Sequence, residues 1–447
     1  MASVAQATMA YKGDQRWLSH RNSSLHSNLR GSLNSLDDGK EQAESRQTRP
    51  SSASGKGGSR NLRASVSMGV LIPLPLNGKG VGYTCGSLAA SMADSHLELT
   101  LVTPRNSWSL PSVEVIEALP RWARRMPYRW VRAYASRNIE REFLSCFDRF
   151  RTPRMAAYLW PGASIETIRE LRRRDVTIFR EQFNCHTATA KRILDQAYGR
   201  LGVAPGHAIV PQTIETERRV LEAVDYVFCP SHLVRRSLLE NGVASCKLLD
   251  TTYGWDPERF SGSRALLAPI EGITAIFVGT ICVRKGAHLL LEYWLKSGIK
   301  GRLILVGEME PIIKEKYAHL FGRGNIVVHN YSNDVGALYR SADMFIFPSL
   351  EEGSPLVIYE ACGFGLPMVT SAMGGGRIVR DNCEGFIIDP YDAVGYCSAM
   401  RRLAQDVELR HRMSRAAAER AQSYTWSEVA SARRKQIFGV LGVPAFD

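Results

Sequence analysis

The sequence alternates short apolar runs with longer amphipathic segments, in two consecutive series. The first series lies at 67–75, 97–103, 155–160, 175–180, 225–230 and 247–253. The second lies at 274–279, 302–307, 325–329, 343–348, 367–371 and 385–389. Apolar runs separated by helical segments are typical of parallel strands that are buried on both faces. The pattern therefore predicts an α/β protein with two Rossmann-like, doubly wound domains that face each other across a cleft.

The two series are separated by a segment that contains Pro257, Pro269 and Gly272. We therefore predict an N-terminal domain at 66–262, a C-terminal domain at 263–422, and a final helix within 423–447 that packs back on the N-terminal domain. A chain of 447 residues accommodates this organisation. Ligands of such domains bind at the carboxyl ends of the strands, so the cleft is the expected site.

Residues 1–65 have a different composition, rich in Ser, Gly, Arg and Asn with almost no apolar periodicity. Such a segment cannot bury enough surface to offset the entropy of ordering it, so we predict a disordered basic tail. Two alternatives stay open. The tail could be an organelle-targeting peptide, or Met68 could be the true start of the chain.

The distribution of charge, cysteines and apolar residues limits the classes of protein to which this chain could belong. The net charge of +13 divides into +5 in the first 65 residues and +8 in the remainder. Residues 121–154 hold ten arginines against three acids, so the charge of the body is largely a local patch. The nine cysteines form no CxxC pair, and no run approaches the about 18 apolar residues of a membrane span. We expect a cytoplasmic protein.

Residues 343–367, DMFIFPSLEEGSPLVIYEACGFGLP, are the most informative stretch. A buried strand leads into a polar turn, after which Ser354 is predicted to cap a helix and Pro355 to begin it. Free backbone N–H groups at such a helix start form an anion site. Gly353 would let the backbone approach a phosphate closely. Glu352 precedes the helix and Glu360 lies within it, and carboxylates accept hydrogen bonds from sugar hydroxyls.

These residues resemble a known family. The spacing of Glu352 and Glu360 is similar to the Glu-x7-Glu signature of the retaining GT-B glycosyltransferases of family 4. Further similar segments are VGTICVRKGAHLLL (278–291), LYRSADMFIFPS (338–349), LPMVTSAMGGGRIVRDNCEGFIID (366–389), AVDYVFCPSHLVRRSLLENGV (223–243) and YGWDPERF (253–260). The resemblance covers roughly 66–430 and is strongest in 270–390.

The resemblance implies roles for residues of the C-terminal domain. Glu360 would hold the nucleotide ribose, and Glu352 would bind hydroxyls of the donor sugar. Lys285 would neutralise charge on the leaving diphosphate. The pyrophosphate would be bound by the backbone N–H groups of Ser354, Leu356 and Val357.

In the N-terminal domain, the turn NGKGVGYT (77–84) resembles the family loop that approaches the donor phosphates and the acceptor, through Gly80 and Gly82. His186, in FNCHTAT, occupies the place of a histidine that the family often has in its catalytic cleft. Two positions differ from the family. Thr280 and Arg377 stand where it commonly has arginine and glutamate, and Arg284 is a candidate to replace the cation missing at Thr280.

No Asp-x-Asp pair occurs in the chain, so we expect metal-independent chemistry in which Lys285 and the helix start replace the metal. We expect a UDP-sugar as donor, with GDP or ADP open, and a glycan, lipid-linked or small-molecule acceptor. Two alternative functions stay open. One is a nucleotide-sugar epimerase or phosphorylase on the same fold, and the other is a non-catalytic nucleotide-sugar-binding protein.

The segment LPRWARRMPYRWVRAYASR (119–137) interleaves aromatic residues with arginines. One interpretation is contact with an anionic membrane surface, which would present a lipid-linked acceptor. The other is an ordinary helix pair with a solvated basic face and buried aromatic side chains. Similar features occur in nucleic-acid-binding proteins, but no nucleic-acid-binding module is recognisable, so we expect no such partner.

Overall fold

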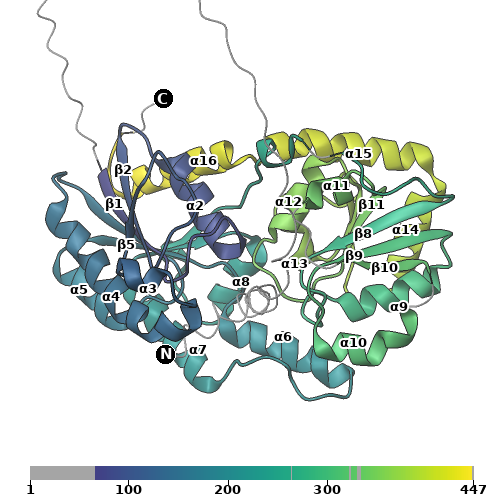
Figure 1. Cartoon of the computed structure of the whole chain (residues 1–447), viewed down its shortest axis with the longest axis horizontal. Coiled ribbons are helices and arrows are strands. Elements are labelled where there is room, and N and C mark those ends of the chain that lie inside the picture. The colour runs from purple at the N-terminus through teal and green to yellow at the C-terminus, as the bar shows by residue number, and fades with distance from the viewer. Residues whose placement is uncertain (1–65, 263, 322–323, 330–333, 445–447) are drawn as a thin grey trace, which may run out of the picture.

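The computed structural model describes residues 66–444, apart from residues 263, 322–323 and 330–333. The tail predicted at 1–65 therefore lies outside the described residues. None of the helices in the described part of the chain combines the length and the apolar character that crossing a bilayer requires. The described residues form two α/β domains, each built on a parallel sheet (Figure 1).

The N-terminal domain contains a seven-stranded sheet in the order β3-β2-β1-β4-β5-β6-β7, with all neighbours parallel. Its strands are Val66–Leu71 (β1), Leu97–Thr103 (β2), Glu114–Glu117 (β3), Met155–Leu159 (β4), Thr177–Glu181 (β5), Tyr226–Cys229 (β6) and Leu248–Asp250 (β7). The strand order reverses between β1 and β4, which is where a doubly wound sheet binds its ligand.

The C-terminal domain contains a six-stranded parallel sheet in the order β10-β9-β8-β11-β12-β13. Its strands are Ile273–Val278 (β8), Gly301–Val306 (β9), Ile326–His329 (β10), Met344–Phe347 (β11), Met368–Thr370 (β12) and Gly385–Ile387 (β13). The order reverses between β8 and β11, so the loops after these two strands meet at the switch point.

Helices flank both sheets. In the N-terminal domain they are Gly80–Met92 (α2), Arg121–Arg124 (α3), Tyr128–Arg149 (α4), Ile165–Arg173 (α5), Thr187–Arg200 (α6), Pro211–Ala223 (α7) and His232–Glu240 (α8). In the C-terminal half they are Ala287–Ser297 (α9), Pro311–Tyr317 (α10), Val335–Tyr339 (α11), Leu356–Gly363 (α12), Ala372–Gly375 (α13), Ala393–Gln405 (α14), Val407–Gln422 (α15) and Trp426–Val440 (α16). Single 3-10 turns are Ser245–Lys247 (η2), Glu258–Phe260 (η3) and Ala318–Leu320 (η4).

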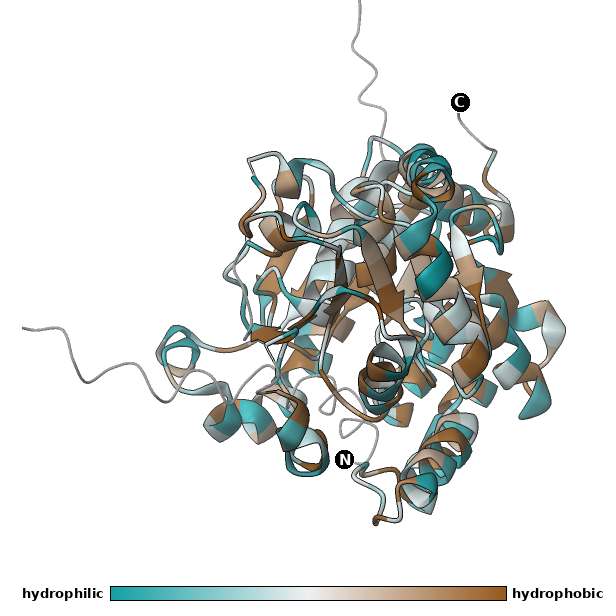
Figure 2. Ribbon diagram, turned by 90° about the vertical axis from the view of Figure 1, so that its right-hand side faces the viewer, coloured by the Kyte–Doolittle hydropathy of each residue, from teal (hydrophilic) through white to brown (hydrophobic). Residues whose placement is uncertain are grey.

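The burial of the central strands explains why they could be predicted from the apolar runs of the sequence. Every residue of β1 and β8 is buried, because helices cover both faces of each sheet. Figure 2 shows hydrophobic strands inside the molecule and hydrophilic residues gathered on the outer faces of the helices. The fold class predicted from the sequence is therefore confirmed.

Three strand predictions need correction. β3 was not predicted, because this short edge strand carries acidic residues and has no fully buried position. The strand predicted at 67–75 ends at Leu71, two residues before Pro73, and the strand predicted at 247–253 is only Leu248–Asp250. Proline lacks the backbone N–H that a strand needs, which limits the first of these strands.

The carboxyl ends of the two sheets meet. The loop after β5 contacts the loop after β11, where a Cβ added to Gly353 would lie 1.7 Å from the carbonyl oxygen of Phe183. The backbone N–H of Cys185 donates to Oε1 of Glu351 at 3.2 Å. Thr252 and Tyr359 share a hydroxyl hydrogen bond of 2.6 Å between the domains. Residues that follow strands of both sheets are thereby brought together.

The final helix, α16, packs against α2 of the N-terminal domain. Its Arg433 is fully buried and forms an ion pair with the buried Glu181 at 2.5 Å. The indole N–H of Trp426 donates to the hydroxyl of Tyr83 at 3.0 Å. Gly254 lies between β7 and β8, and its missing side chain leaves room for the carbonyl of Tyr424, just before α16.

Candidate functional site

The start of α12 stands at the end of β11, at the switch point of the C-terminal sheet. The helix begins at Leu356 and its capping position is Pro355, which makes no side-chain cap bond. The first N–H groups of an α-helix have no partner within the helix. Those of Leu356 and Val357 have no hydrogen-bond partner among the described residues, and both side chains are half-buried. The helix start can therefore bind an anion.

The predicted capping residue of this helix is wrong. Ser354 was expected at the cap with Pro355 as the first helical residue, but the helix begins one residue later. The hydroxyl of Ser354 instead shares a 2.5 Å hydrogen bond with the hydroxyl of Tyr359. Tyr359 is fixed from its other side by Thr252, so Ser354 belongs to the contact between the domains.

The role expected for Gly353 also needs correction. We expected it to admit a phosphate close to the backbone, but its close neighbour is the carbonyl oxygen of Phe183. Any side chain at Gly353 would push this N-terminal-domain loop away. The glycine therefore allows the two domains to approach, and the anion site rests on Leu356 and Val357.

A cluster of four charged side chains lies where the loop after β8 meets the loop after β11. Nζ of Lys285 is 2.7 Å from Oε1 of Glu352, and NH1 of Arg284 is 3.1 Å from the same oxygen. Arg284 also donates to the carbonyl oxygen of Glu351 at 2.8 Å and forms an ion pair with its carboxylate at 3.4 Å. Three of these residues were predicted from the sequence. Glu351 was not predicted, since its only sequence signal was its position beside Glu352.

The two cations determine the charge of Glu352. Burial alone would raise the pKa of this carboxyl group, but Arg284 and Lys285 outweigh burial and hold the pKa below its ordinary value. Glu351 behaves differently, since burial raises its pKa and Arg284 only partly opposes the rise. Glu352 is therefore ionised at neutral pH and can accept hydrogen bonds from hydroxyl groups.

Glu360 lies on α12 with a separate set of partners. The hydroxyl of Tyr339 donates to its Oε2 at 3.1 Å, and NH1 of Arg259 lies 3.5 Å from its Oε1. Burial raises the pKa of Glu360, while Arg259 and Tyr339 oppose the rise. The guanidinium of Arg259 in turn lies 4.5 Å from the ring centre of Tyr83 on α2. Tyr339 and Arg259 lie in segments that the resemblance included, but their side-chain partners could not be predicted from the sequence.

Gly80 and Gly82 lie in the first turn of α2, which follows the β1 loop. Gly80 has a φ of +53°, which favours glycine, and a Cβ on Gly82 would lie 3.0 Å from the carbonyl oxygen of Pro75. Both glycines therefore allow a tight turn from β1 into α2. The next residue, Tyr83, reaches Arg259, so this turn is connected to Glu360.

His186 caps the start of α6 and is buried. Its Nδ1 accepts from the backbone N–H of Ala188 at 3.2 Å, and its Nε2 lies 3.7 Å from Oε2 of Glu217. Burial lowers the pKa of His186, Glu217 opposes this, and Arg180 adds to it. The imidazole is therefore neutral at neutral pH. Its loop contacts the C-terminal domain through Cys185 and Glu351, but the imidazole itself faces Glu217 of the N-terminal domain.

The two departures from the family pattern have distinct surroundings. Thr280 is exposed at the end of β8. The guanidinium of Arg284 points to Glu351 and Glu352, so its contacts are with this carboxylate cluster. Arg377 forms an ion pair of 2.5 Å with Asp250 of the N-terminal domain.

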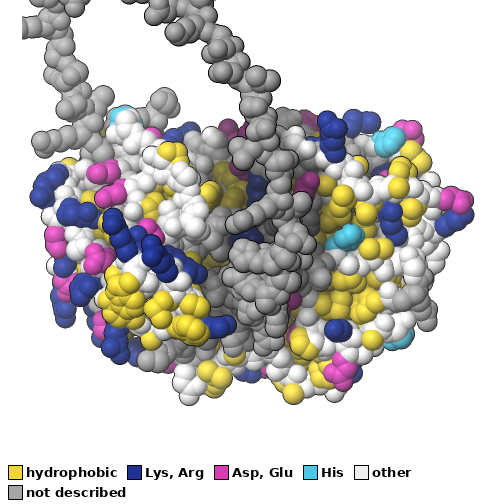
Figure 3. Space-filling view, viewed as in Figure 1, with side chains coloured by type: hydrophobic (Ala, Val, Ile, Leu, Met, Phe, Trp, Pro, Cys, Tyr) yellow, Lys and Arg dark blue, Asp and Glu magenta, His cyan; other side chains and the backbone are white. Residues whose placement is uncertain are grey.

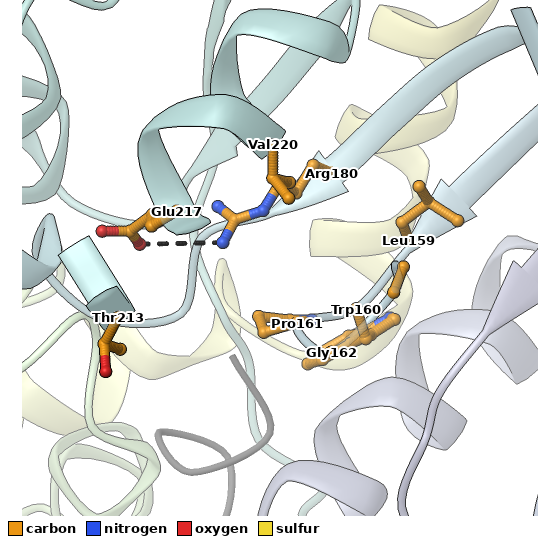
Figure 4. A pocket seen from close by; sticks show the side chains of 9 residues that line it. Leu159, Trp160, Pro161, Gly162, Arg180, Thr213, Glu217 and Val220 are labelled. Carbon is orange, nitrogen blue, oxygen red and sulfur yellow. Dashed lines mark ion pairs between the residues drawn. The ribbon is translucent and has the colours of Figure 1, made fainter. Parts of the chain in front are cut away.

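A small cavity of about 20 Å³ lies near His186, at the carboxyl ends of β4 and β5 (Figure 4). Arg180 and Glu217 face each other across it, with 3.6 Å between NH2 and Oε1. The buried Nε1 of Trp160 and Oγ1 of Thr213 have no hydrogen-bond partner within the part of the chain that the structure describes. This volume suits about one water molecule and is too small for a sugar.

The C-terminal domain is similar in sequence to known proteins. Residues 263–420 match the family described as Glycosyl transferases group 1. The chain is 40% identical over 196 residues to a D-inositol 3-phosphate glycosyltransferase of Streptomyces griseus, covering 39% of this chain and 41% of the relative. It is 29% identical over 219 residues to a sulfoquinovosyl transferase of Arabidopsis thaliana, covering 46% and 42%. The chain thus spans about two fifths of the length of these curated relatives.

Solved structures identify the fold of the whole described chain. Sucrose-phosphate synthase from Thermosynechococcus elongatus superposes with a TM-score of 0.64 at 17% identity, covering 84% of this chain and 99% of that one. The HepE protein of Anabaena, in complex with UDP and glucose, superposes with a TM-score of 0.58 at 13% identity, covering 83% and 99%. At these identities the likeness establishes the fold alone, which is the GT-B arrangement of two Rossmann-like domains.

Proposed function

We propose that this protein transfers a hexosyl group from a UDP-sugar to a glycan, lipid-linked or small-molecule acceptor, with retention of configuration. The observation that carries this proposal is the position of Lys285, Arg284 and Glu352 beside the open N–H groups at the start of α12. Cations and helix N–H groups stabilise the negative charge of a departing diphosphate. An ionised carboxylate can orient the sugar from which the diphosphate departs.

Three parts of the donor would be bound by residues of the C-terminal domain. Its diphosphate binds the N–H groups of Leu356 and Val357, and its ribose hydroxyls bind Glu360. The sugar hydroxyls bind Glu352, which is charged because Arg284 and Lys285 lower its pKa. Lys285 then lies between the sugar-binding carboxylate and the diphosphate, where it neutralises the charge that develops as the bond breaks.

The chemical step is a front-side displacement. The bond from the anomeric carbon to the β-phosphate oxygen breaks as the bond to the acceptor oxygen forms on the same face. The departing phosphate oxygen takes the proton of the acceptor hydroxyl, so the products are UDP and the glycoside. Lys285 and the helix start supply the positive charge that a metal supplies in other enzymes.

The direct experiment begins with a thermal-shift screen of nucleotide sugars, followed by a nucleotide-release assay with candidate acceptors. Proton NMR of the first product would then give its anomeric configuration. A product with the configuration of the donor supports the proposal, and an inverted product contradicts it. Isomerised or phosphorolysed donor would instead identify the epimerase or phosphorylase alternative.

The substitution at Thr280 motivates a second candidate, a nucleotide-sugar-binding protein without catalysis. Thr280 stands where the resembling family has arginine, and the guanidinium of Arg284 is bound to Glu351 and Glu352. In that case a nucleotide sugar would raise the melting temperature in the thermal-shift screen, but no acceptor would cause nucleotide release. Restoring the cation with Thr280→Arg would then be the informative second variant.

A further inference from the structure

The hairpin of α3 and α4 carries an exposed surface that we call the aromatic-arginine face. It joins three exposed aromatic side chains with four exposed arginines of the same segment. Its members are Trp122, Trp130, Tyr134, Arg121, Arg125, Arg129 and Arg137. Figure 3 shows apolar side chains bordered by Lys and Arg side chains over these helices, on the left of the view.

The aromatic rings of this face are open to solvent. Trp122 is 62% exposed, Trp130 is 65% exposed and Tyr134 is 47% exposed. The large hydrophobic side chains exposed elsewhere in the described ranges are all aliphatic. The rings of Trp122 and Tyr134 lie 6.1 Å apart, so α3 and α4 present them together. The interpretation of 119–137 as a helix pair with buried aromatic side chains is therefore wrong for these three residues.

A separate small core explains why these rings point outward. The inner faces of α3 and α4 pack on each other through five buried residues, which are Leu119, Ala123, Tyr128, Val131 and Ala135. Because these positions supply the apolar packing of the hairpin, Trp122, Trp130 and Tyr134 do not contribute to it. A face that is exposed, aromatic and unneeded for packing is typical of an interaction surface.

The charge of the face defines the partner. Residues 119–137 contain six arginines and no acid. Arg124 forms an ion pair with Glu117 at 2.6 Å and donates to backbone carbonyls, so it stabilises the hairpin. Arg121, Arg125, Arg129 and Arg137 are exposed and have no acidic partner within the described part of the chain. The partner must therefore be anionic as well as able to accept aromatic rings.

The aromatic-arginine face lies beside the carboxyl ends of strands in the N-terminal domain. α3 follows the carboxyl end of β3, and the hydroxyl of Tyr128 donates to the carbonyl of Pro73, in the loop after β1, at 3.3 Å. Arg105, in the loop after β2, donates to the carbonyl of Met126 between the two helices at 3.3 Å. The hairpin is thus fixed to the loops that border the proposed acceptor side.

We infer that the aromatic-arginine face docks on the surface of a lipid bilayer that carries anionic headgroups. Tryptophan and tyrosine rings favour the headgroup region, where their apolar and polar parts are both accommodated. Arginines beside them bind lipid phosphates, and each contributes about a fivefold gain in affinity at low salt. This inference does not rest on the proposed glycosyl transfer, because it concerns a surface outside the nucleotide site.

The test compares sedimentation of the full chain with vesicles of phosphatidylcholine and with vesicles that also contain phosphatidylglycerol. We expect binding to the anionic vesicles only, and weaker binding as the salt concentration rises. Arg125→Gln with Arg129→Gln should weaken it by on the order of tenfold or more. Trp122→Ser with Trp130→Ser should weaken it several-fold even at low salt. A blue shift of tryptophan fluorescence on vesicle addition should disappear in the tryptophan variant.

Matched controls keep the result interpretable. Arg412→Gln with Arg415→Gln removes two exposed arginines of α15 and should leave vesicle binding unchanged. The melting temperature of each variant reports whether the fold is intact, so failure of docking is measured independently of the proposed function. Equal binding to neutral vesicles, or wild-type binding by the tryptophan variant, would overturn the inference. Binding of single-stranded RNA in preference to anionic vesicles would assign the face to nucleic acid and would also overturn it.

Discussion

Nζ of Lys285 lies 2.7 Å from Oε1 of Glu352, at the point where the loops after β8 and β11 meet. This ion pair joins the residue proposed to neutralise the leaving group to the residue proposed to hold the sugar. The positive charge of Lys285 helps to lower the pKa of Glu352 and so keeps this carboxyl group ionised.

The first prediction concerns Lys285. Lys285→Ala should lower kcat for nucleotide release by about a hundredfold or more, since a charge that acts mainly in the transition state is lost. The KM for the donor should change much less. Lys296→Ala, on the exposed side of α9, is the matched control and should leave both constants unchanged. A variant at Lys285 with normal turnover would exclude the proposed role.

The second prediction concerns Glu360. Glu360→Gln should raise the Kd for UDP by roughly tenfold to a hundredfold, because a carboxyl group that accepts hydrogen bonds from ribose hydroxyls is replaced by an amide with only one acceptor oxygen. Isothermal titration calorimetry measures this directly. Tyr339→Phe removes the hydroxyl that binds Glu360 and leaves the carboxylate in place, so it should have a smaller effect. If both variants bind UDP as the wild type does, the ribose lies elsewhere.

The third prediction concerns the attachment of α16 to the N-terminal domain. Arg433→Met should lower the free energy of unfolding by about 3–5 kcal/mol, because Glu181 would remain buried and without its cation. Adding Glu181→Gln should recover part of this loss. Arg434→Met, one residue along, removes an ion pair at the surface and should cost about 1 kcal/mol or less. Urea denaturation of the four proteins compares these values.

The fourth prediction is a pH dependence of stability. Burial lowers the pKa of His288, on α9, from 6.5 to about 4. The folded state therefore favours the neutral ring. The contribution of His288 to stability is present above the ordinary pKa and is lost as the pH falls from 6.5 toward 4.

His288→Leu should therefore remove about 2 kcal/mol of the loss in stability between about pH 7 and about pH 5. Urea denaturation at both pH values measures the difference. His411→Gln, an exposed histidine on α15, should leave the pH dependence as it is in the wild type. An unchanged pH dependence in His288→Leu would show that the ring is hydrated in the folded state.

The sequence predicted those parts of the fold that depend on local pattern. The wholly buried strands β1 and β8 were readable because every position is apolar or small, which a sheet covered on both faces requires. The edge strand β3 was not predicted, because two of its four residues are acidic, none is fully buried and the strand has no periodicity to detect.

Some site residues could be predicted from their spacing in the sequence. The side chains that bind them could not. Glu352 and Glu360 were identified from the turn and the helix that contain them. The contacts of Glu351 with Cys185 and of Arg259 with Glu360 were not predicted, because each joins residues that are far apart in the sequence. Gly353 and Ser354 were assigned to the ligand because nothing in the sequence placed Phe183 or Tyr359 beside them. Contacts between domains depend on tertiary packing, which local pattern does not encode.

The central claim is that the nucleotide diphosphate binds the start of α12, with Glu360 on the ribose. A crystal structure of the protein with UDP tests it most directly. Phosphate oxygens within hydrogen-bond distance of the N–H groups of Leu356 and Val357, and ribose hydroxyls on Glu360, are the predicted result. UDP bound to the N-terminal sheet, or those two N–H groups covered by protein, would contradict it.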